Sequence, residues 1–315
     1  EVGRREEALT VAMESVEIRR RLTEESPAAY EPSLASALNN LGNRLSEVGR
    51  LHDALTVAEQ AVAIYSRVAA TNPAAYESEL AASRSNLAGA YLTFGQIERA
   101  LPLYEQTLAD SVRILGEDHP MTLLARNNLA GAYESAGGHE RAMPLYEQTL
   151  ADSVRILGED HPDTLLARNN LAGAYESAGD LSRSVALYEQ TLADSVRILG
   201  EDHPDTLLAR NNLAGAYALA DDVDKAIALY ERTLTDRGRV LGESHPDTLT
   251  SQSNLAGAYA LKGDLARAVA LYEQTVAQSV RILSEDHPMV QSMRNHLMYW
   301  REKARSARVD LSTDS

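Results

Sequence analysis

Apolar residues recur every three or four positions over most of this chain, which is the spacing of one face of an α-helix. The stretch from His119 to Gly158 shows the arrangement. A first helix is predicted to begin near Pro120, because a missing N–H costs nothing in the first helical turn, and to end at Gly137. A second helix is predicted from about His139 to Leu157, with apolar residues at Ala142, Met143, Leu145, Tyr146, Leu150, Val154 and Ile156. The pattern therefore predicts a helical hairpin.

This hairpin is one copy of a unit that repeats every 42 residues. The segment Leu-Tyr-Glu-Gln-Thr-Leu-Ala-Asp-Ser-Val-Arg-Ile-Leu-Gly-Glu-Asp-His-Pro begins at Leu103, Leu145 and Leu187, with looser copies at Leu229 and Leu271. The phrase Asn-Leu-Ala-Gly-Ala-Tyr begins at Asn86, Asn128, Asn170, Asn212 and Asn254. A fixed period of about 20 to 50 residues indicates a solenoid, because a single hairpin cannot bury its own apolar face and must stack on the next. The predicted fold is all-α, an α-solenoid of stacked antiparallel helix hairpins, whose function is expected to lie in an extended surface.

The repeat divides the chain into four predicted parts. Residues 1–80 carry a longer unit of 46 residues, marked by Val2-Gly3-Arg4 and Val48-Gly49-Arg50, and they begin in the middle of a repeat. Residues 81–288 hold five 42-residue units, residues 289–305 a C-terminal capping helix, and residues 306–315 a disordered tail. Counted by helix, this gives a lone second helix at about 3–22, six hairpins over about 34–283 and a final helix. In that final helix Arg301 replaces the expected core Tyr, as suits a terminal cap.

The N-terminal helix shows no such polar replacement. Its apolar residues are expected to need a partner; they are Leu9, Val11, Val16, Ile18 and Leu22. Since the chain begins at Glu1, inside a repeat, we expect either that the native protein continues upstream or that this edge helix forms a homodimer.

The chain is acidic, with a net charge of −16 and a pI near 4.9. An acidic chain does not displace the counterions of a phosphate backbone, so nucleic acid is not an expected partner, and anionic membrane surfaces are disfavoured for the same reason. No apolar stretch approaches the roughly 18 residues of a transmembrane helix. Cys is absent, which excludes disulfides and thiolate metal sites and fits a cytoplasmic protein. Basic residues are nearly all Arg, a bias that favours a bacterial source.

The helical positions resemble those of the tetratricopeptide repeat (TPR). Leu129, Ala130 and Tyr133 match the family pattern on the first helix, and Ala142 and Tyr146 match it on the second, while Arg126 stands where the usual Trp would be. The 42-residue period, the Asn-Asn-Leu-Ala phrase and the Leu-Gly-Glu-Asp-His-Pro connector resemble the kinesin light chain type of repeat. The resemblance implies a right-handed superhelix, with first helices on its concave face.

The resemblance also implies that the concave face binds a protein or peptide as an extended segment. The expected contact residues are Asn86, Asn127, Asn128, Gly131, Glu134, Asn169, Asn170, Gly173, Glu176, Asn211, Asn212 and Asn254. Residues 1–80 look like units of large bacterial regulatory proteins, so the chain is expected to be a sensor or adaptor region of one. The alternative is a structural spacer or self-association module without a dedicated ligand.

Two interpretations of the asparagines remain open. Their amides, which are both donors and acceptors, either hold a peptide backbone or bond to adjacent helices, and one residue of each pair is expected in each role. The mid-helix glycines indicate either close approach by a partner or copying of one ancestral unit. Glu134 and Glu176 occupy positions where later units have Ala218 and Ala260, so the groove is expected to prefer a segment with a basic centre.

The Glu117-Asp118-His119 segment and its copies resemble metal-ligand clusters, but they are interpreted as the starts of helices. Metal ligands must converge at about 2 Å, and copies one unit apart are expected about 10 Å apart. The sequence shows no Ser-His-Asp arrangement, no paired catalytic carboxylates and no Gly-x4-Gly-Lys phosphate loop. We therefore expect no metal, no cofactor and no enzymatic activity.

Overall fold

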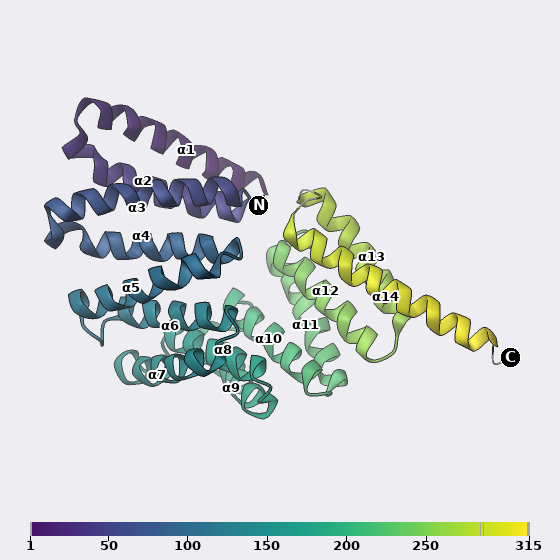
Figure 1. Cartoon of the computed structure of the whole chain (residues 1–315). Coiled ribbons are helices and arrows are strands. Elements are labelled where there is room, and N and C mark those ends of the chain that lie inside the picture. The colour runs from purple at the N-terminus through teal and green to yellow at the C-terminus, as the bar shows by residue number, and fades with distance from the viewer. Residues whose placement is uncertain (1, 284, 286, 314–315) are drawn as a thin grey trace. The chain divides into compact units, whose positions relative to one another are not determined.

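The computed structural model describes residues 2–283, 285 and 287–313, and this part of the chain is all-helical (Figure 1). Within it, fourteen helices follow one another without a strand. Their bounds are α1 Val2–Glu25, α2 Pro27–Glu47, α3 Leu51–Thr71, α4 Pro73–Thr93, α5 Ile97–Leu115, α6 Pro120–Ser135, α7 His139–Leu157, α8 Pro162–Ser177, α9 Leu181–Leu199, α10 Pro204–Leu219, α11 Val223–Leu241, α12 Pro246–Leu261, α13 Leu265–Ile282 and α14 Pro288–Thr313.

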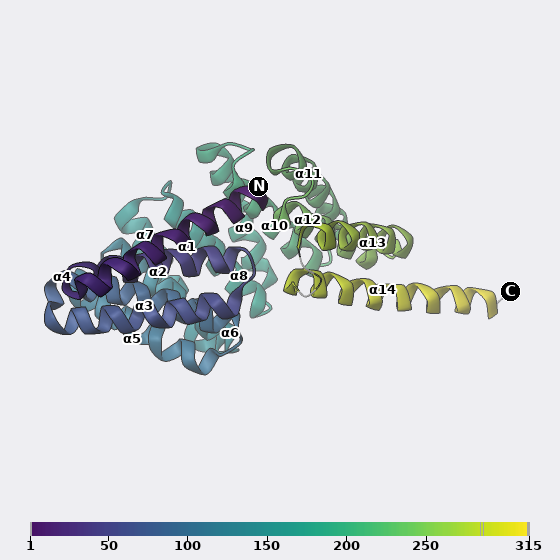
Figure 2. The same cartoon turned by 90° about the horizontal axis from the view of Figure 1, so that it is seen from above.

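The predicted order of elements is confirmed. The lone helix α1 is followed by six hairpins, from α2–α3 to α12–α13, and then by α14. Consecutive helices pack against each other as in a TPR solenoid. The helix α14 lies beside α13 and continues past it (Figure 2). It is helical to Thr313, whereas a disordered tail is predicted from residue 306; residues 314–315 lie outside the described part.

The chain divides into two compact units, residues 1–167 and 168–315, with the boundary inside α8. The core of the first unit contains the large cluster made by α1 to α4, in which Leu, Val and Ala side chains such as Leu38, Ala61 and Val68 are buried. The second unit has cores built from Tyr and Ala, as where Ala214, Ala226 and Tyr230 meet Leu255. Small Ala side chains bring the helix backbones close together, so the tyrosine rings fill the remaining space at high density.

The connector between successive 42-residue repeats is the Gly-Glu-Asp-His-Pro segment, which ends one helix and begins the next. Gly158 ends α7 with a φ of 91°, a left-handed conformation that favours glycine. The Thr164 hydroxyl donates to the Gly158 carbonyl oxygen at 2.7 Å, and the Asp163 amide donates to Nδ1 of His161 at 3.1 Å. The same bonds occur at the preceding connector, where Asp118 also pairs with Arg155 at 2.6 Å. These bonds support the interpretation of the connector as a helix start.

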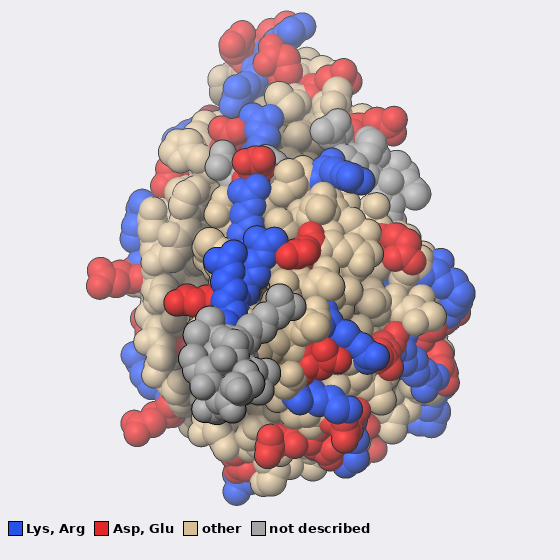
Figure 3. Space-filling view, turned by 90° about the vertical axis from the view of Figure 1, so that its right-hand side faces the viewer, with Lys and Arg blue, Asp and Glu red and all other residues tan. Residues whose placement is uncertain are grey.

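Charges of both signs lie on the surface. On the face shown in Figure 3, several Lys and Arg side chains lie in a line, and Asp and Glu side chains lie beside them. The helix α14 contributes basic residues to an otherwise acidic chain, namely Arg294, Arg301, Lys303 and Arg305. Of these, Arg301 pairs with Glu273 at 2.7 Å, in the register where earlier units place a tyrosine hydroxyl against a glutamate.

Candidate functional site

One side of each first helix is open to solvent. In α6 this side carries Leu124, Asn128, Gly131 and Ser135, which follow one another at helical spacing. Leu124 is 44% exposed, although the neighbouring Leu123 is buried. Leu166 and Leu208 are exposed at the same position of the next two first helices. The first helices therefore present a surface that mixes apolar and amide side chains.

A polar crevice of about 330 Å³ opens on this surface in the first unit. It lies over the first helices α2, α4 and α6, with Ala54 and Ala58 of α3 beneath. Its polar lining residues are Asn39, Asn43, Ser46, Ser85, Asn86, Thr93, Tyr104 and Asn128. The crevice thus brings together two of the predicted contact residues, Asn86 and Asn128, with two further amides, Asn39 and Asn43.

Two further crevices are more apolar. One, of about 240 Å³, lies between α4 and α6 above α5, and the other, of about 110 Å³, lies among α6, α7 and the start of α8. The first shares Ser85 and Asn128 with the polar crevice, and the two apolar ones share Met121 and Leu124. Because neighbouring crevices share lining residues, the three lie side by side; together we call them the first-helix groove.

The asparagines form bridges between successive first helices. In the second unit, Nδ2 of Asn212 donates to Oδ1 of Asn169 at 3.0 Å, and Nδ2 of Asn254 donates to Oδ1 of Asn211 at 3.3 Å. In the first unit, Asn128 reaches Ser85 at 3.4 Å. These bonds favour the interpretation that the amides fix helix geometry. Asn127, Asn128, Asn169, Asn170, Asn212 and Asn254 are nevertheless half-buried, Asn86 is exposed and Asn211 is buried.

The mid-helix glycines are approached by the chain itself. A Cβ at Gly131 would lie 3.3 Å from the hydroxyl of Tyr146, and one at Gly173 would lie 3.2 Å from that of Tyr188. The same contact recurs in the other 42-residue units, at Gly89, Gly215 and Gly257. Each glycine makes room for the tyrosine of the second helix in its own hairpin. Sequence reasoning considered a partner or simple copying and missed this internal contact.

Glu134 and Glu176, which are not among the lining residues of the three crevices, lie near these tyrosines. The Tyr146 hydroxyl donates to Oε2 of Glu134 at 3.1 Å. Burial, and then the Glu134 charge, raises the pKa of Tyr146, so the phenol stays protonated as a donor. In the second unit, burial and the charge of Glu176 raise the pKa of Tyr230. Glu134 and Glu176 are both half-buried.

Buried ion pairs hold the first helices to the second, and sequence reasoning missed them. Arg126 is only 4% exposed, and its Nη1 lies 2.7 Å from Oδ2 of Asp152. Burial pushes the pKa of Asp152 upward, but hydrogen bonds from Arg155 and Arg126 outweigh it and lower that pKa. Equivalent pairs are Arg84–Asp110, Arg168–Asp194 and Arg210–Asp236. The available signal was that Arg and Asp recur together 26 residues apart and both become Gln at 252 and 278.

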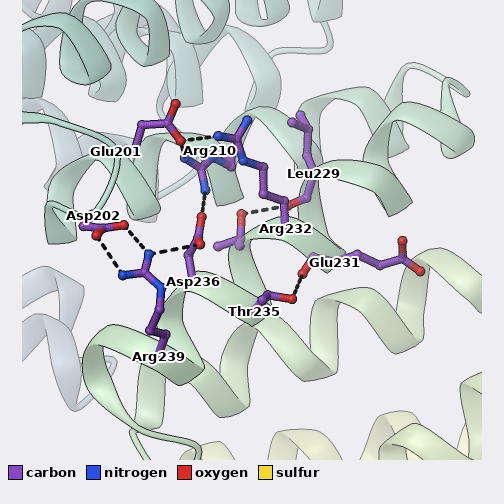
Figure 4. Close-up of polar contacts among 10 residues, drawn as sticks. Glu201, Asp202, Arg210, Leu229, Glu231, Arg232, Thr235, Asp236 and Arg239 are labelled. Carbon is purple, nitrogen blue, oxygen red and sulfur yellow. Dashed lines mark hydrogen bonds and ion pairs between the residues drawn. The ribbon is translucent and has the colours of Figure 1, made fainter.

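Figure 4 shows this cluster in the second unit. Asp236 bridges Arg210 at 2.6 Å and Arg239 at 3.2 Å, and Asp202 of the connector contacts Arg239. Glu201 contacts both Arg210 and Arg232. The connector acids are therefore tied to helices, which limits their use in chemistry. Among the described residues, no three His, Asp or Glu side chains gather as metal ligands would. Within the same residues, no helix has the length and apolar character needed to cross a bilayer.

Comparison with known proteins identifies the repeats. The sequence model of the tetratricopeptide repeat matches residues 34–72, 79–153, 164–205 and 205–279. No curated protein matches the chain. A putative kinesin light chain from Podosopora anserina, with nearly identical TPR-like repeats, is 34% identical; the alignment covers 65% of this chain and 96% of that one, with a TM-score of 0.56.

Two other solved structures share the fold. BtubC (BKLC) from P. vanneervenii is 25% identical over 77% of this chain and 94% of its own, with a TM-score of 0.59. A Rap protein complexed with Competence and Sporulation Factor is 16% identical over 95% and 87%, with a TM-score of 0.54. Such repeats form scaffolds typical of protein–protein interaction and are generally not enzymes. The repeat matches and the shared hairpin architecture lead to one conclusion: the chain belongs to the tetratricopeptide repeat family, and its repeats are kinesin light chain-like.

Proposed function

We propose that this chain binds an extended segment of a partner protein in the first-helix groove, and that it serves as the sensor or adaptor region of a larger bacterial protein. The observation that carries the proposal is the row of three adjacent crevices along α2, α4 and α6, whose lining includes both exposed amides and exposed apolar side chains. Amides satisfy a peptide backbone, and apolar crevices accept its side chains. The Rap protein, solved with its peptide factor, is an example of the same fold holding a ligand.

The predicted contact residues divide into two groups within this proposal. Asn86 and the exposed Asn43 are not engaged in the bridges described above, so they are the first candidates for direct contact with the backbone of a ligand. Asn128, Asn212 and Asn254 act mainly by holding the helices, and of the three Asn128 also lines the groove. Glu134 and Glu176 favour a ligand with Lys or Arg at its centre.

The proposal is tested with two matched pairs of amides. In Asn43→Ala/Asn86→Ala, the groove loses two exposed amides; in the control, Gln106→Ala/Gln148→Ala, the second helices α5 and α7 lose two. Wild-type protein is used to select ligands from a displayed library of random linear peptides. Each lost hydrogen bond is worth about 1 kcal/mol, so the groove variant is expected to bind the selected peptides about 10- to 100-fold more weakly. The control variant is expected to bind them normally.

Both variants are expected to keep the wild-type melting temperature, since all four amides lie on the surface. Unchanged affinity in the groove variant, or an equal loss in both, would contradict the proposed location of the ligand. The selected sequences also report charge preference, and a pool without Lys or Arg enrichment would argue against a role for Glu134 and Glu176.

A second candidate function, self-association, is favoured by one observation at the other end of the first unit. A cavity of about 660 Å³ lies beside α1 and is lined by Met13, Val16 and Ile18 together with Leu41 and Leu45. Val11 and Ile18 of α1 are 64% and 57% exposed. Exposed apolar residues of this kind mark surfaces that associate. In that case the array acts as a spacer that joins two copies.

A further inference from the structure

The first-helix groove contains a position at which the repeat changes from acidic to apolar. The residue after each His-Pro connector is an exposed Asp in three copies and Met in the other two; these residues are Met121, Asp163, Asp205, Asp247 and Met289. Met121 is 46% exposed, so an apolar side chain stands in solvent where most copies carry a carboxylate. The helix dipole favours an acid at this position, so the replacement by Met gives up a local stabilisation. In a chain of nearly copied units, such a replacement points to a local function.

Met121 belongs to both apolar crevices of the groove. It lines each of them together with Leu124, which is exposed to a similar extent. The backbone amide of Met121 donates to Nδ1 of His119 at 3.2 Å, and the amide of the equivalent Asp205 makes the same bond to His203. The backbone is therefore held in the same way in both kinds of repeat, and the difference between them lies in the side chain.

The larger apolar crevice, of about 240 Å³, offers an uncharged surface. Of the described residues that line it, none is Asp, Glu, Lys or Arg. The Thr107 hydroxyl in its lining donates to the carbonyl oxygen of Leu103 at 2.7 Å, so it is satisfied within α5. A cavity of about 150 Å³ is large enough to hold a benzene ring, so this crevice has room for the side chain of a leucine or a phenylalanine. Its larger apolar lining residues are Ile114, Leu115, Met121 and Leu124.

An aspartate in place of Met121 would change this chemistry. A carboxylate in the lining would lose water when an apolar side chain entered the crevice, and an ion without a partner is costly to desolvate. The next copy has such an acid, because Asp163 lines the smaller crevice of about 110 Å³. The larger crevice, with Met121 in place of the acid, is therefore the better site for an apolar group.

The larger apolar crevice also adjoins the polar crevice. Both are lined by Ser85 and Asn128, and Nδ2 of Asn128 donates to the Ser85 hydroxyl oxygen at 3.4 Å. Successive side chains of an extended segment point to opposite sides of its backbone. A segment whose backbone is held by the amides of the polar crevice is thus able to place a neighbouring side chain in the apolar one.

We propose that the larger apolar crevice is a subsite for one bulky apolar side chain of the bound segment, a Leu, Ile, Met or Phe, and that Met121 determines this specificity. The proposal rests on the function proposed above and names the class of residue that one part of the groove accepts. Contact of such a side chain with Met121 and Leu124 removes exposed apolar surface of both partners from water, which favours binding. The equivalent residues of the second unit, Asp205 and Asp247, do not supply an apolar side chain at this position.

The test uses replacements that introduce the residue of other copies. Met121→Asp introduces the Asp that three copies have at this position, so the fold is expected to persist. The control, Gly138→Asp, adds the same charge before α7, where three other second helices are preceded by Asp180, Asp222 and Asp264. Gly138 is not among the lining residues of the three crevices. Peptides are selected from a displayed library of random linear sequences by wild type and by each variant.

Wild type and Gly138→Asp are expected to select peptides with a bulky apolar residue at one fixed position. Replacing that peptide residue by Ala is expected to weaken binding to wild type about 10- to 100-fold, because several buried methylene groups are lost. Met121→Asp is expected to lose the preference, and the same Ala replacement is expected to change its affinity less than about 3-fold. If Met121→Asp selects the same apolar residue as wild type, if both variants lose the preference equally, or if the wild-type peptides share no such residue, the subsite is wrong while groove binding stands.

A separate measurement does not depend on peptide selection. In the NMR spectrum of wild type with isotope-labelled methionine methyl groups, the Met121 signal is identified by its absence from the Met121→Asp spectrum. Met298, which is also exposed, is identified with Met298→Leu and serves as the internal control. N-acetyl-leucinamide is expected to shift the Met121 signal more than the Met298 signal, and N-acetyl-glycinamide is expected to shift neither.

If no peptides are selected at all, the proposed groove function fails, and this titration alone decides whether the crevice takes an apolar side chain. A Met121 signal that moves no more than the Met298 signal, or that responds equally to the two compounds, would overturn the inference.

Discussion

At the scale of single residues, the buried arginines are the least expected part of this array. The family pattern places a large aromatic residue at the position of Arg126, where burial needs no counterion. A guanidinium stays charged when it is buried, so it must bring a partner with it. Asp152 is that partner, and Arg155 and Asp118 extend the pair to the connector. Where Arg is absent, at Gln252, the acid is absent too, at Gln278, as expected if each requires the other.

This dependence predicts a strong coupling between Arg126 and Asp152. Arg126→Gln leaves a half-buried carboxylate with less compensation, and Asp152→Gln leaves a buried guanidinium, so each is expected to lower the free energy of unfolding by about 3 kcal/mol. The double replacement reproduces the Gln pair of the last unit. It is expected to destabilise the protein by at least about 1 kcal/mol less than the two single replacements added together. Urea denaturation of the four proteins measures this coupling.

The exposed pair Arg44 and Glu47 provides the control, because both side chains are more than 40% accessible. The same double-mutant cycle, made of the wild type, the two single replacements and the double replacement, is expected to give a coupling below about 0.5 kcal/mol at that pair. If the two cycles give equal couplings, the buried pair does not hold the hairpin as described.

Sequence reasoning placed the apolar core of this region but not its ion pairs, for a physical reason. Leu129, Ala130 and Tyr133 are buried as expected, because helical periodicity identifies a face. Periodicity treats Arg126 as a solvent residue, since charges on helices are usually exposed. Only the joint recurrence of Arg and Asp at a separation of 26 residues, which spans two helices, carries the information that they meet.

At the scale of helices, the distance between the two helices of a hairpin is set by a glycine and a tyrosine. The Tyr146 hydroxyl of α7 reaches the backbone of α6 at Gly131 and is held there by Glu134. A side chain at residue 131 would push the ring away or break that hydrogen bond. The penalty of a mid-helix glycine, about 1 kcal/mol against Ala, is therefore offset by the contact it permits.

Gly131→Ala is accordingly expected to give little or none of the usual gain of about 1 kcal/mol from replacing a helical glycine by alanine. Tyr146→Phe removes the hydroxyl that meets the new Cβ, and alone it should cost about 1 kcal/mol through the lost hydrogen bond to Glu134. In the Tyr146→Phe background, Gly131→Ala is expected to raise the free energy of unfolding by the full amount, about 1 kcal/mol. Chemical denaturation measures all four proteins, and a full gain from Gly131→Ala alone would show that the tyrosine does not set the spacing.

The order of the helices was predictable from the sequence, but their exact course was less so. Pro120 and Gly158 mark a helix start and a helix end, and both are confirmed. Pro144 lies inside α7, which nevertheless runs from His139 to Leu157. The α14 helix continues beyond 305 because its sequence contains no Gly or Pro to stop it before Thr313.

At the scale of the whole molecule, the first and last helices each expose apolar side chains. The face of α1 presents Val11 and Ile18 beside a large cavity, whereas α14 presents Met298 and Tyr299 among basic residues. A surface of apolar residues flanked by charges of both signs, such as Glu14 and Arg21 on α1, is able to pair with a second copy of itself. The charges of α14 are mostly positive and oppose such pairing.

We therefore expect association, where it occurs, to use α1. Sedimentation velocity across a concentration series should show wild-type protein moving from monomer toward dimer. Val11→Glu/Ile18→Glu places charges in the contact and should keep the protein monomeric, because an unpaired charge is not tolerated at the centre of an apolar interface. The matched variant Met298→Glu/Tyr299→Glu changes the other exposed apolar pair and should associate as wild type does. A wild type that stays monomeric at the highest concentration would remove self-association as a function, and it would leave binding in the first-helix groove as the role of the array.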